Sequence, residues 1–333
     1  MKLTTRNLAI LLAAQLGLAL LLTLSAGQFG TTQAGQPLLS FDTANIQRIR
    51  IRSPDQDPVM LQKKDEGWLL PDYYEVPASG LKVQELLTQL KGLEKRLPLA
   101  TSASARERFK VAEDKFERVI ELYDGGDEPV ARLYLGDSPG FRRVYARAGD
   151  DDTVFELAYG VHQASAKSDD WADRNLLRLP EDELNRVELP GVTLERVDDA
   201  WRVADLKEAE QSNDEAIRGA LEHLSSLGFV SIQGTEPPTG QPVLELKVTR
   251  NSGDAVTYQI YPGTDDADPQ LRSSAHPWTF RVAKYLLEDL QKLTRDQLVK
   301  RPPESGASEP PSAEPPAAET DQPSPEPAAA PAE

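Results

Sequence analysis

The chain has 333 residues, enough for two ordinary domains at roughly 150 residues each, and 39% hydrophobic residues allow a core. Its formal net charge of -17 argues against nucleic acid as a partner, because binding to phosphates requires a basic face. The sequence contains no cysteine, which excludes disulfides, Cys-ligated zinc, thiol catalysis and a lipoprotein anchor.

An apolar run from Leu8 to Leu24 opens the chain, directly after Lys2 and Arg6. As a helix this run would be roughly 25 Å long, which is at the short end for a bilayer span. Positive charge before the run predicts that the N-terminus is cytoplasmic and that the bulk of the chain is periplasmic. We therefore predict a single-pass anchor in a bacterial inner membrane, with residues 1–36 as cytoplasmic start, transmembrane helix and linker.

Two other interpretations of residues 8–24 remain open. A cleaved signal peptide requires small residues before the cleavage point, and Leu24-Ser25-Ala26 fits that rule poorly. Thr32-Gln33-Ala34 fits it better but lies far from the apolar run. A buried helix of a soluble domain is the third interpretation, although the run is apolar all round and follows a basic start.

Residues 37–180 form the first predicted unit. It begins with a strand in which apolar residues alternate, continues with a hairpin whose second strand carries Trp68, and then enters a helix. Paired strands follow on either side of the turn Asp124-Gly125-Gly126-Asp127, then two more short strands over 144–147 and 154–157, and a closing helix. The apolar positions that carry the first strand, hairpin and helix are Ile46, Ile49, Ile51, Val59, Leu61, Val83, Leu86, Leu87 and Leu90.

Residues 181–300 repeat this order of events. A strand, a hairpin carrying Trp201, a helix, paired strands and two further short strands follow one another. The residues whose spacing predicts these strands and this helix are Leu184, Val187, Leu189, Leu194, Val197, Ile217, Leu221, Leu224, Leu244, Leu246, Val248, Tyr258, Ile260, 271–273 and 278–282. The endings also match, Asp173–Leu177 against Arg295–Val299.

The predicted fold class is α+β, with two tandem repeats of an antiparallel meander sheet and packed helices. Any α+β protein offers strands and helices in a similar order, and this is the alternative to a duplication. The two tryptophans in matching positions favour the duplication.

Residues 301–333 form a tail rich in Pro, Ala and Glu. Residues 302–333 contain no Lys or Arg and no large apolar residue, so they cannot bury enough surface to offset the entropy of ordering. We predict a disordered, solvating tail; a spacer or docking peptide is the alternative. Its acids are Glu304, Glu309, Glu314, Glu319, Asp321, Glu326 and Glu333.

Several short motifs resemble those of the bacterial DUF4340 domain family, whose function is unknown. They are the opening strand 46–51, Glu66-Gly67-Trp68, Leu133–Asp137, Val144–Arg147 and Asp169–Leu177. The resemblance covers residues 41–179 well and the second unit more loosely. It implies an N-terminal anchor and a gene context beside gliding-type ABC transporter components, and hence an accessory role in an envelope complex. It implies no catalytic residue.

The titratable residues predict neither a metal site nor a cofactor site. His162, His223 and His276 lack a second histidine at ligand spacing, and each is expected to be a surface or partly buried side chain. Asp150-Asp151-Asp152 and Asp265-Asp266-Ala267-Asp268 lack the calcium-loop spacing and are expected to form turns, with a weak cation site as the alternative.

Phosphate-loop and nucleophile-elbow motifs do not occur in the sequence. A Ser-His-Asp catalytic triad stays open as an alternative, because its three residues can be distant in the chain. Aromatic residues that could form an exposed binding surface are the remaining candidates. A structural role in core packing or in anchoring a loop is the alternative for each. The candidates are Tyr73-Tyr74, Phe141-Arg142-Arg143 and Trp171.

The sequence therefore predicts a non-enzymatic, membrane-anchored envelope protein. The resemblance implies that it serves as an interaction or accessory subunit of an ABC-transporter-associated complex. A periplasmic solute- or glycan-binding module is the second hypothesis, which an aromatic cleft between the units would favour. An unfamiliar hydrolase is the third.

Overall fold

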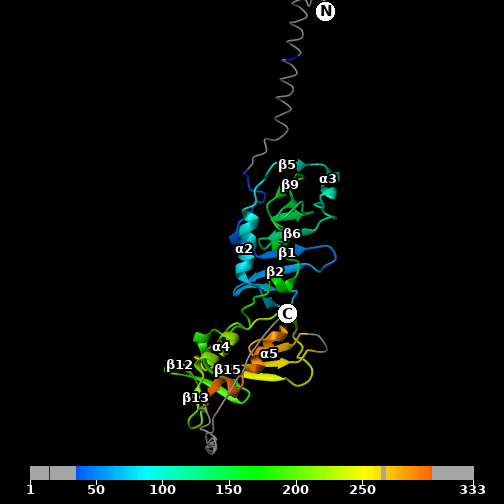
Figure 1. Ribbon diagram of the computed structural model, residues 1–333. Helices are drawn as coiled ribbons and strands as arrows, with labels where there is room; N and C mark the ends of the chain where they lie inside the picture. The colour runs from blue at the N-terminus through cyan, green and yellow to red at the C-terminus, as the bar shows by residue number, and fades with distance from the viewer. Residues whose placement is uncertain (1–14, 16–34, 264–267, 302–333) are drawn as a thin grey trace, which may run out of the picture.

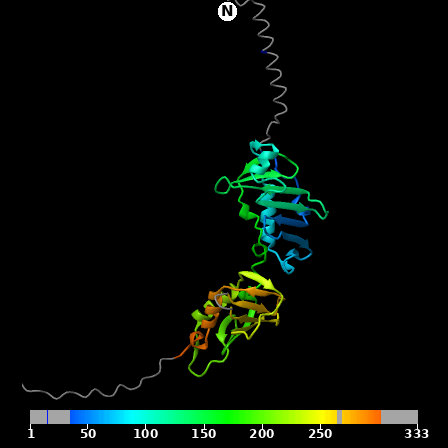
Figure 2. The same ribbon diagram turned by 90° about the vertical axis from the view of Figure 1, so that its right-hand side faces the viewer.

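Two antiparallel sheets, each with helices on one face, make up a computed structural model that describes Gln15, residues 35–263 and residues 268–301 (Figure 1). Turned by 90°, the two sheets still lie in separate units, one below the other (Figure 2). The α+β class with mainly antiparallel sheets is confirmed.

The first sheet has nine strands in the order β4-β3-β2-β1-β6-β7-β8-β9-β5. Every neighbouring pair is antiparallel. The strands are β1 Arg48–Arg52, β2 Val59–Lys64, β3 Gly67–Leu70, β4 Val76–Pro77, β5 Pro98–Ala100, β6 Arg118–Tyr123, β7 Ala131–Leu135, β8 Val144–Ala148 and β9 Val154–Leu157.

Helix α2 (Gly80–Lys91) lies along one face of the first sheet and crosses its strands (Figure 1). Ser79 caps its first turn by accepting the backbone N–H of Lys82. The apolar stripe of the helix packs against the alternate residues of the strands, Ile49 and Ile51 among them. The stripe is Val83, Leu86, Leu87 and Leu90.

The second sheet has eight antiparallel strands in the order β12-β11-β10-β15-β16-β17-β18-β14. In both sheets the strand that follows the helix, β5 or β14, pairs at the far edge beside the last strand of the meander. The strands are β10 Leu184–Leu189, β11 Val192–Val197, β12 Ala200–Val203, β14 Ser231–Gly234, β15 Leu244–Arg250, β16 Ala255–Tyr261, β17 Gln270–Ser273 and β18 Thr279–Arg281.

Helices α4 (Asp214–Ser225), α5 (Lys284–Lys292) and α6 (Arg295–Leu298) belong to the second unit. A two-stranded sheet joins β13 (Gln211–Ser212) to β19 (Val299–Lys300), so the end of the described chain pairs with the segment before α4. Short helices complete the structure: α3 (Ala103–Arg108), η1 (Thr43–Asn45), η2 (Val161–Gln163), η3 (Ser168–Asp170) and η4 (Glu181–Glu183).

The strands, hairpins and first helices expected from the sequence are present in both units. The closing helix expected before the ending Asp173–Leu177 of the first unit is wrong: between β9 and β10 the chain forms only the short 3-10 helices η2, η3 and η4. Ala172 bridges to Ala78, and the N–H of Asp173 donates to the carbonyl of Pro77, so tertiary pairing replaces a helix there.

The predicted anchor, residues 8–24, lies outside the described residues except for Gln15, and the predicted tail, residues 302–333, lies outside them entirely. Within the part of the chain that the structure describes, no helix is long and apolar enough to cross a membrane.

Candidate functional site

Strand β1 places three arginines on the face of the first sheet that is opposite to α2. Its sequence alternates arginine and isoleucine, and successive side chains of a strand point to opposite faces. Ile49 and Ile51 are fully buried, whereas Arg48, Arg50 and Arg52 are half-buried. The isoleucines thus serve the core, and the arginines form a charged outer surface.

A single buried carboxylate lies among these arginines. Glu121 pairs with Arg50 across β1 and β6, and its side chain is only 4% exposed. Arg132 Nε donates to Glu121 Oε1 at 2.9 Å. Arg52 Nε and Arg50 Nη1 lie 3.6 and 3.9 Å from Oε2. One negative charge is therefore shared by three guanidinium groups.

Arg48 extends the cluster along β1. Its guanidinium lies 4.4 Å from the centre of the Tyr123 ring and donates to the carbonyl of Gly126 at 3.0 Å. We call Arg48, Arg50, Arg52, Arg132 and Glu121 the arginine face. Its formal charge is positive in a chain whose overall charge is strongly negative.

The segment between α3 and β6 covers the neighbouring part of this sheet face. Phe109 and Phe116 pack there on a small second core of Val111, Val119, Tyr134 and Val154. A Cβ at Gly136 would lie 1.9 Å from the carbonyl oxygen of Phe109, so this close approach requires glycine. The covering segment meets the arginine face at Arg52, whose guanidinium lies 5.1 Å from the Phe116 ring centre.

On the corresponding face of the second sheet, Arg186 and Lys247 pair with partly exposed glutamates. Arg186 lies 3.5 Å from Glu188 and 3.3 Å from Glu195, and Lys247 lies 3.6 Å from Glu188. Arg202, opposite Glu195, and Arg272, opposite Gln259, lie on the same face. What distinguishes the first sheet is that several of its arginines share one buried carboxylate.

The junction between the units is a hydrogen-bonded contact built on Tyr73 and Asp169. The Tyr73 hydroxyl lies 2.5 Å from Asp169 Oδ1 and 2.7 Å from the carbonyl oxygen of Ile232 in β14. The N–H of Ile232 donates to both Tyr73 Oη and Asp169 Oδ1 at 3.1 Å. Burial and the neighbouring Asp169 raise the pKa of Tyr73, which keeps the hydroxyl protonated as a donor.

Two further residues fasten the junction. Arg174 Nη1 donates to the carbonyls of Phe229 and Val230 at 2.7 and 2.9 Å, and its Nη2 donates to the carbonyl of Asp169 at 2.8 Å. Trp278 Nε1 donates to the carbonyl of Tyr74, a residue held at a φ of 55°. The first unit is thus hydrogen-bonded to strand β14, to the residues just before it, and to the turn before β18 of the second unit.

Each unit also has a groove between its tryptophan strand and its first helix. Trp201, Ile217 and Arg218 line a groove of about 650 Å³ in the second unit. Trp68 and Leu87 line one of about 430 Å³ in the first. Both tryptophans are half-buried and pack on the core with one side only.

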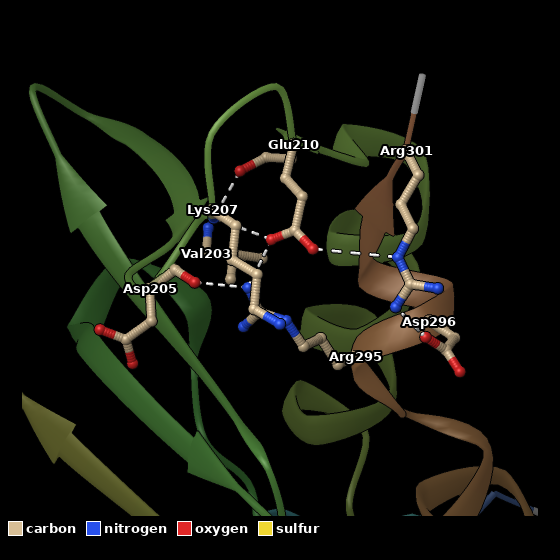
Figure 3. A network of polar contacts seen from close by, with 8 residues as sticks. Val203, Asp205, Lys207, Glu210, Arg295, Asp296 and Arg301 are labelled. Atoms are coloured by element: carbon tan, nitrogen blue, oxygen red, sulfur yellow. Dashed lines mark hydrogen bonds and ion pairs between the residues drawn. The ribbon is translucent and has the colours of Figure 1, made fainter. Parts of the chain in front are cut away.

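A polar network beside the second groove holds the end of the described chain (Figure 3). Glu210, 8% exposed, accepts the N–H of Lys207 at 2.9 Å and Arg295 Nη2 at 2.6 Å. Arg301 Nε lies 3.9 Å from its other oxygen and Arg301 Nη2 lies 2.6 Å from Asp296. The Lys207 N–H and the Arg295 guanidinium lower the pKa of Glu210.

The aromatic candidates from the sequence fall into different places. Tyr73 and Tyr74 lie at the junction, and Trp171 is buried at 4% exposure with its Nε1 donating to the carbonyl of Ser165. Phe141 is 88% exposed, with the Arg142 guanidinium 5.2 Å from its ring centre. They do not form one binding surface.

The histidines and acidic runs also lie apart. His162 is in η2 beside a cavity of about 300 Å³ that Trp171 also lines, His223 is exposed on α4, and His276 lies at the junction. In the run 150–152, Asp151 accepts Lys95 Nζ at 2.9 Å and Asp152 pairs with Arg106. Residues 265–267 of the second run lie outside the described residues. No group of three His, Asp or Glu side chains placed to hold a metal occurs among the described residues.

The arginine face was not identified from the sequence, although its signal is present. The alternation Arg48-Ile49-Arg50-Ile51-Arg52 predicts three arginines on one face of a strand. What the sequence does not give is the partner strand β6, and hence Glu121 as the carboxylate that they share.

A comparison with protein-family models gives one finding. The model described as "Domain of unknown function (DUF4340)" matches residues 68–247, more than half of the chain. The chain belongs to the DUF4340 family. The matched span begins at Trp68 in β3 and ends at Lys247 in β15, so it includes Tyr73, Asp169 and Ile232 of the junction. It also extends past the residues 41–179 that resemble the family best by their motifs.

No curated protein and no solved structure matches the chain. The DUF4340 match therefore identifies the family but assigns no function, since function resides in the sites that a fold carries.

Proposed function

We propose that this DUF4340 protein is a non-enzymatic, membrane-anchored accessory protein of the bacterial envelope that works by binding other proteins. The observation that carries the proposal is the pair of charged sheet faces on two units joined by the Tyr73–Asp169–Ile232 contact. On the first face several arginines surround one buried glutamate, and on the second the cations pair with partly exposed glutamates. Charged faces of complementary pattern select partners and steer their approach more than they add affinity.

In this proposal residues 8–24 form the anchor, the N-terminus is cytoplasmic, and residues 35–301 lie on the periplasmic side. The partners are components of an ABC-transporter-associated complex, as the family resemblance implies. A fixed junction suits this role, because both faces would be presented to a complex in one constant relation.

We also infer that the two units are tandem repeats of one ancestral unit. The strand order β3-β2-β1-β6-β7-β8-β9-β5 in the first sheet has the same succession as the whole of the second sheet. Trp68 pairs with Lys63, and Trp201 with Arg196, at the same step of the hairpin. Superposing the backbone of the first unit on that of the second tests this inference. We expect α2 to coincide with α4, and Trp68 with Trp201.

Protease treatment of spheroplasts tests the topology. We expect external protease to degrade the region 35–301 in intact spheroplasts. Full protection would place this region in the cytoplasm and would contradict the anchor as proposed.

Affinity purification from detergent-solubilised membranes tests the accessory role. We expect transporter components to co-purify with the full chain and to be lost from either Arg50→Glu or Lys247→Glu, which reverse one charge on the first or second face. Recovery of the same proteins with both variants, or of no protein beyond the tagged chain, would contradict partner binding through these faces.

A second candidate function, binding of a periplasmic glycan or solute, is favoured by the groove of about 650 Å³ beside Trp201. A half-exposed tryptophan next to polar groups, here Arg202 and Arg218, can stack on a sugar ring while the polar groups bind hydroxyls. Soluble cell-wall glycan fragments should then change the tryptophan fluorescence of the full chain but not that of Trp201→Phe. An identical response in both would eliminate this groove.

A further inference from the structure

We propose that the arginine face is an intramolecular docking surface for the distal part of this chain's own acidic C-terminal segment, residues 319–333. This goes beyond the accessory role, because it gives the first sheet a ligand within the same molecule. External partners of the arginine face would then compete with that segment.

The first step concerns the donors that Glu121 leaves unused. A guanidinium carries five N–H donors in a planar fork that suits a carboxylate. Arg132 uses the near oxygen of Glu121, but Arg50 and Arg52 approach the other oxygen only at 3.9 and 3.6 Å. Among the described residues the Nε atoms of both arginines have no hydrogen-bond acceptor. These Nε atoms are buried, so a further carboxylate would have to bind at the exposed terminal N–H groups of the two guanidiniums.

The second step concerns access. The side chains of Arg50, Arg52 and Arg132 are 40%, 31% and 33% exposed, so their guanidinium groups are reachable from solvent. Their backbone is nonetheless fixed in the strands of a sheet. Glu121 lies beside all three guanidinium groups, and the Phe116 ring lies beside that of Arg52. Preorganised donors lose less entropy on binding than free surface arginines do.

The third step is charge complementarity. Residues 302–333 contain seven carboxylates and no Lys or Arg. Glu319 and Asp321 are two residues apart and have no proline between them, so in a β-like extended conformation they would face the same side about 7 Å apart. Arg50 and Arg52 are also two residues apart on one face of a strand, a spacing of about 7 Å. The two carboxylates thus match the two arginines in charge and spacing.

The fourth step is reach. Arg301, the last described residue, is held on the second unit by Glu210 and Asp296. Glu319 lies eighteen positions further along the chain, and an extended chain of that length covers about 55 Å. A folded unit of about 120 residues has a diameter of roughly 35 Å. The segment can therefore pass the second unit, and attachment gives it an effective concentration of about a millimolar.

The second sheet offers this segment a less suitable surface, because its cations face carboxylates or bind backbone carbonyls. Arg202 lies opposite Glu195, and Arg272 donates to the carbonyls of Thr235 and Pro277. Arg186 and Lys247 are already paired with Glu188 and Glu195, and these carboxylates would repel an acidic peptide. The network around Arg295 and Arg301 is likewise occupied by Glu210 and Asp296. The arginine face is thus the better site for the acids of residues 319–333.

Because the chain has no cysteine, two spin labels can be placed on the full-length protein without background. One goes on Asp127→Cys, in the exposed turn beside Arg48, and the other on Thr320→Cys. We expect a population of short label-to-label distances at low salt that is lost in 0.5 M salt, since Coulomb contacts between exposed groups are screened.

Matched variants decide the site. Glu319→Gln with Asp321→Asn should remove the short-distance population without touching the folded region, and Arg50→Gln with Arg52→Gln should remove it from the other side. Arg186→Gln on the second sheet should leave it unchanged. A short-distance population that survives the two tail substitutions, is absent from the unsubstituted tail, or grows with protein concentration would overturn the proposal, the last by placing the segment on a neighbouring copy.

Discussion

Arg50 faces Glu121 across β1 and β6 on the first sheet, whereas on the second sheet Glu188 faces Lys247 across β10 and β15. The two pairs occupy corresponding places in sheets of the same strand order, but their polarity is reversed. On the first sheet the carboxylate is buried at 4% exposure, whereas Glu188 is 39% exposed. The comparison teaches that sheets with the same succession of strands can carry different charge patterns on their outer faces, one built around a buried carboxylate and one around exposed pairs.

Because of this difference, we expect the charged pairs to contribute more to the stability of the first sheet than to that of the second. Opposite charges facing each other on neighbouring strands contribute modestly when they are exposed. A buried carboxylate surrounded by guanidinium groups is different, because its removal leaves those cations without compensation.

The largest expected effect is that of Glu121→Gln, which removes the shared carboxylate from Arg50, Arg52 and Arg132. We expect the free energy of unfolding to fall by about 3 kcal/mol. Glu188→Gln on the second sheet is the matched control and should cost less than about 0.5 kcal/mol. Denaturant unfolding monitored by circular dichroism measures both. Equal costs would mean that the two faces do not differ in the way proposed.

The two tryptophans give the next effect. Trp68 and Trp201 pack on the core with one side and are partly exposed on the other. Truncation to alanine should cost about 2 kcal/mol at either site, less than the loss of a fully buried tryptophan. Comparable losses in thermal unfolding are expected if the units are equivalent. A loss at one site only would break the correspondence between the units.

The junction is expected to show a smaller effect. Tyr73→Phe removes the hydroxyl that contacts Asp169 and Ile232, and should lower the free energy of unfolding by about 1 kcal/mol. Tyr74→Phe is the control, because its hydroxyl has no hydrogen-bond partner among the described residues. Amide hydrogen exchange should show faster opening of β14 in Tyr73→Phe alone. Unchanged exchange would show that the units are joined by other contacts.

The sequence predicted the parts of the fold that depend on local pattern. Alternation gave β1 and β10, the apolar stripe gave α2 and α4, and the turn residues gave the hairpins. It did not give β5 and β14, because short edge strands such as Pro98–Ala100 carry no periodic signal. It placed a closing helix in the first unit where the bridge between Ala78 and Ala172 forms instead.

The candidate site was predictable only in part, for the same physical reason. One strand of it, Arg48 to Arg52, is visible as an alternation, but the register that brings Glu121 and Arg132 beside it depends on contacts distant in sequence. Likewise, the sequence shows Tyr73 in an aromatic pair and Asp169 at the start of a family-like motif. Their shared contact with Ile232 depends on the packing of one unit on the other.

The smallest expected effect concerns His276, which lies at the junction and has no counterpart in the first unit among the described residues. Its Nε2 lies 2.7 Å from the carbonyl oxygen of Leu176, and its ring stacks on Trp278 at 5.5 Å between centres. Nε2 donates in the neutral ring, so Nδ1 carries no proton. Burial, together with the nearby Arg250, lowers the pKa of His276 although the Leu176 carbonyl opposes this.

A histidine whose folded-state pKa is lowered resists protonation that the unfolded chain accepts at about pH 6.5. Its contribution is therefore absent above that pH, where both states are neutral, and the free energy of unfolding falls as the pH drops below it. His276→Gln, which keeps a donor near Leu176, should remove this part of the pH dependence between pH 7 and 5, whereas His223→Gln on the exposed face of α4 should not. Unfolding by denaturant at several pH values measures the slope, and the same slope in both variants would mean that His276 does not titrate against the fold of the junction.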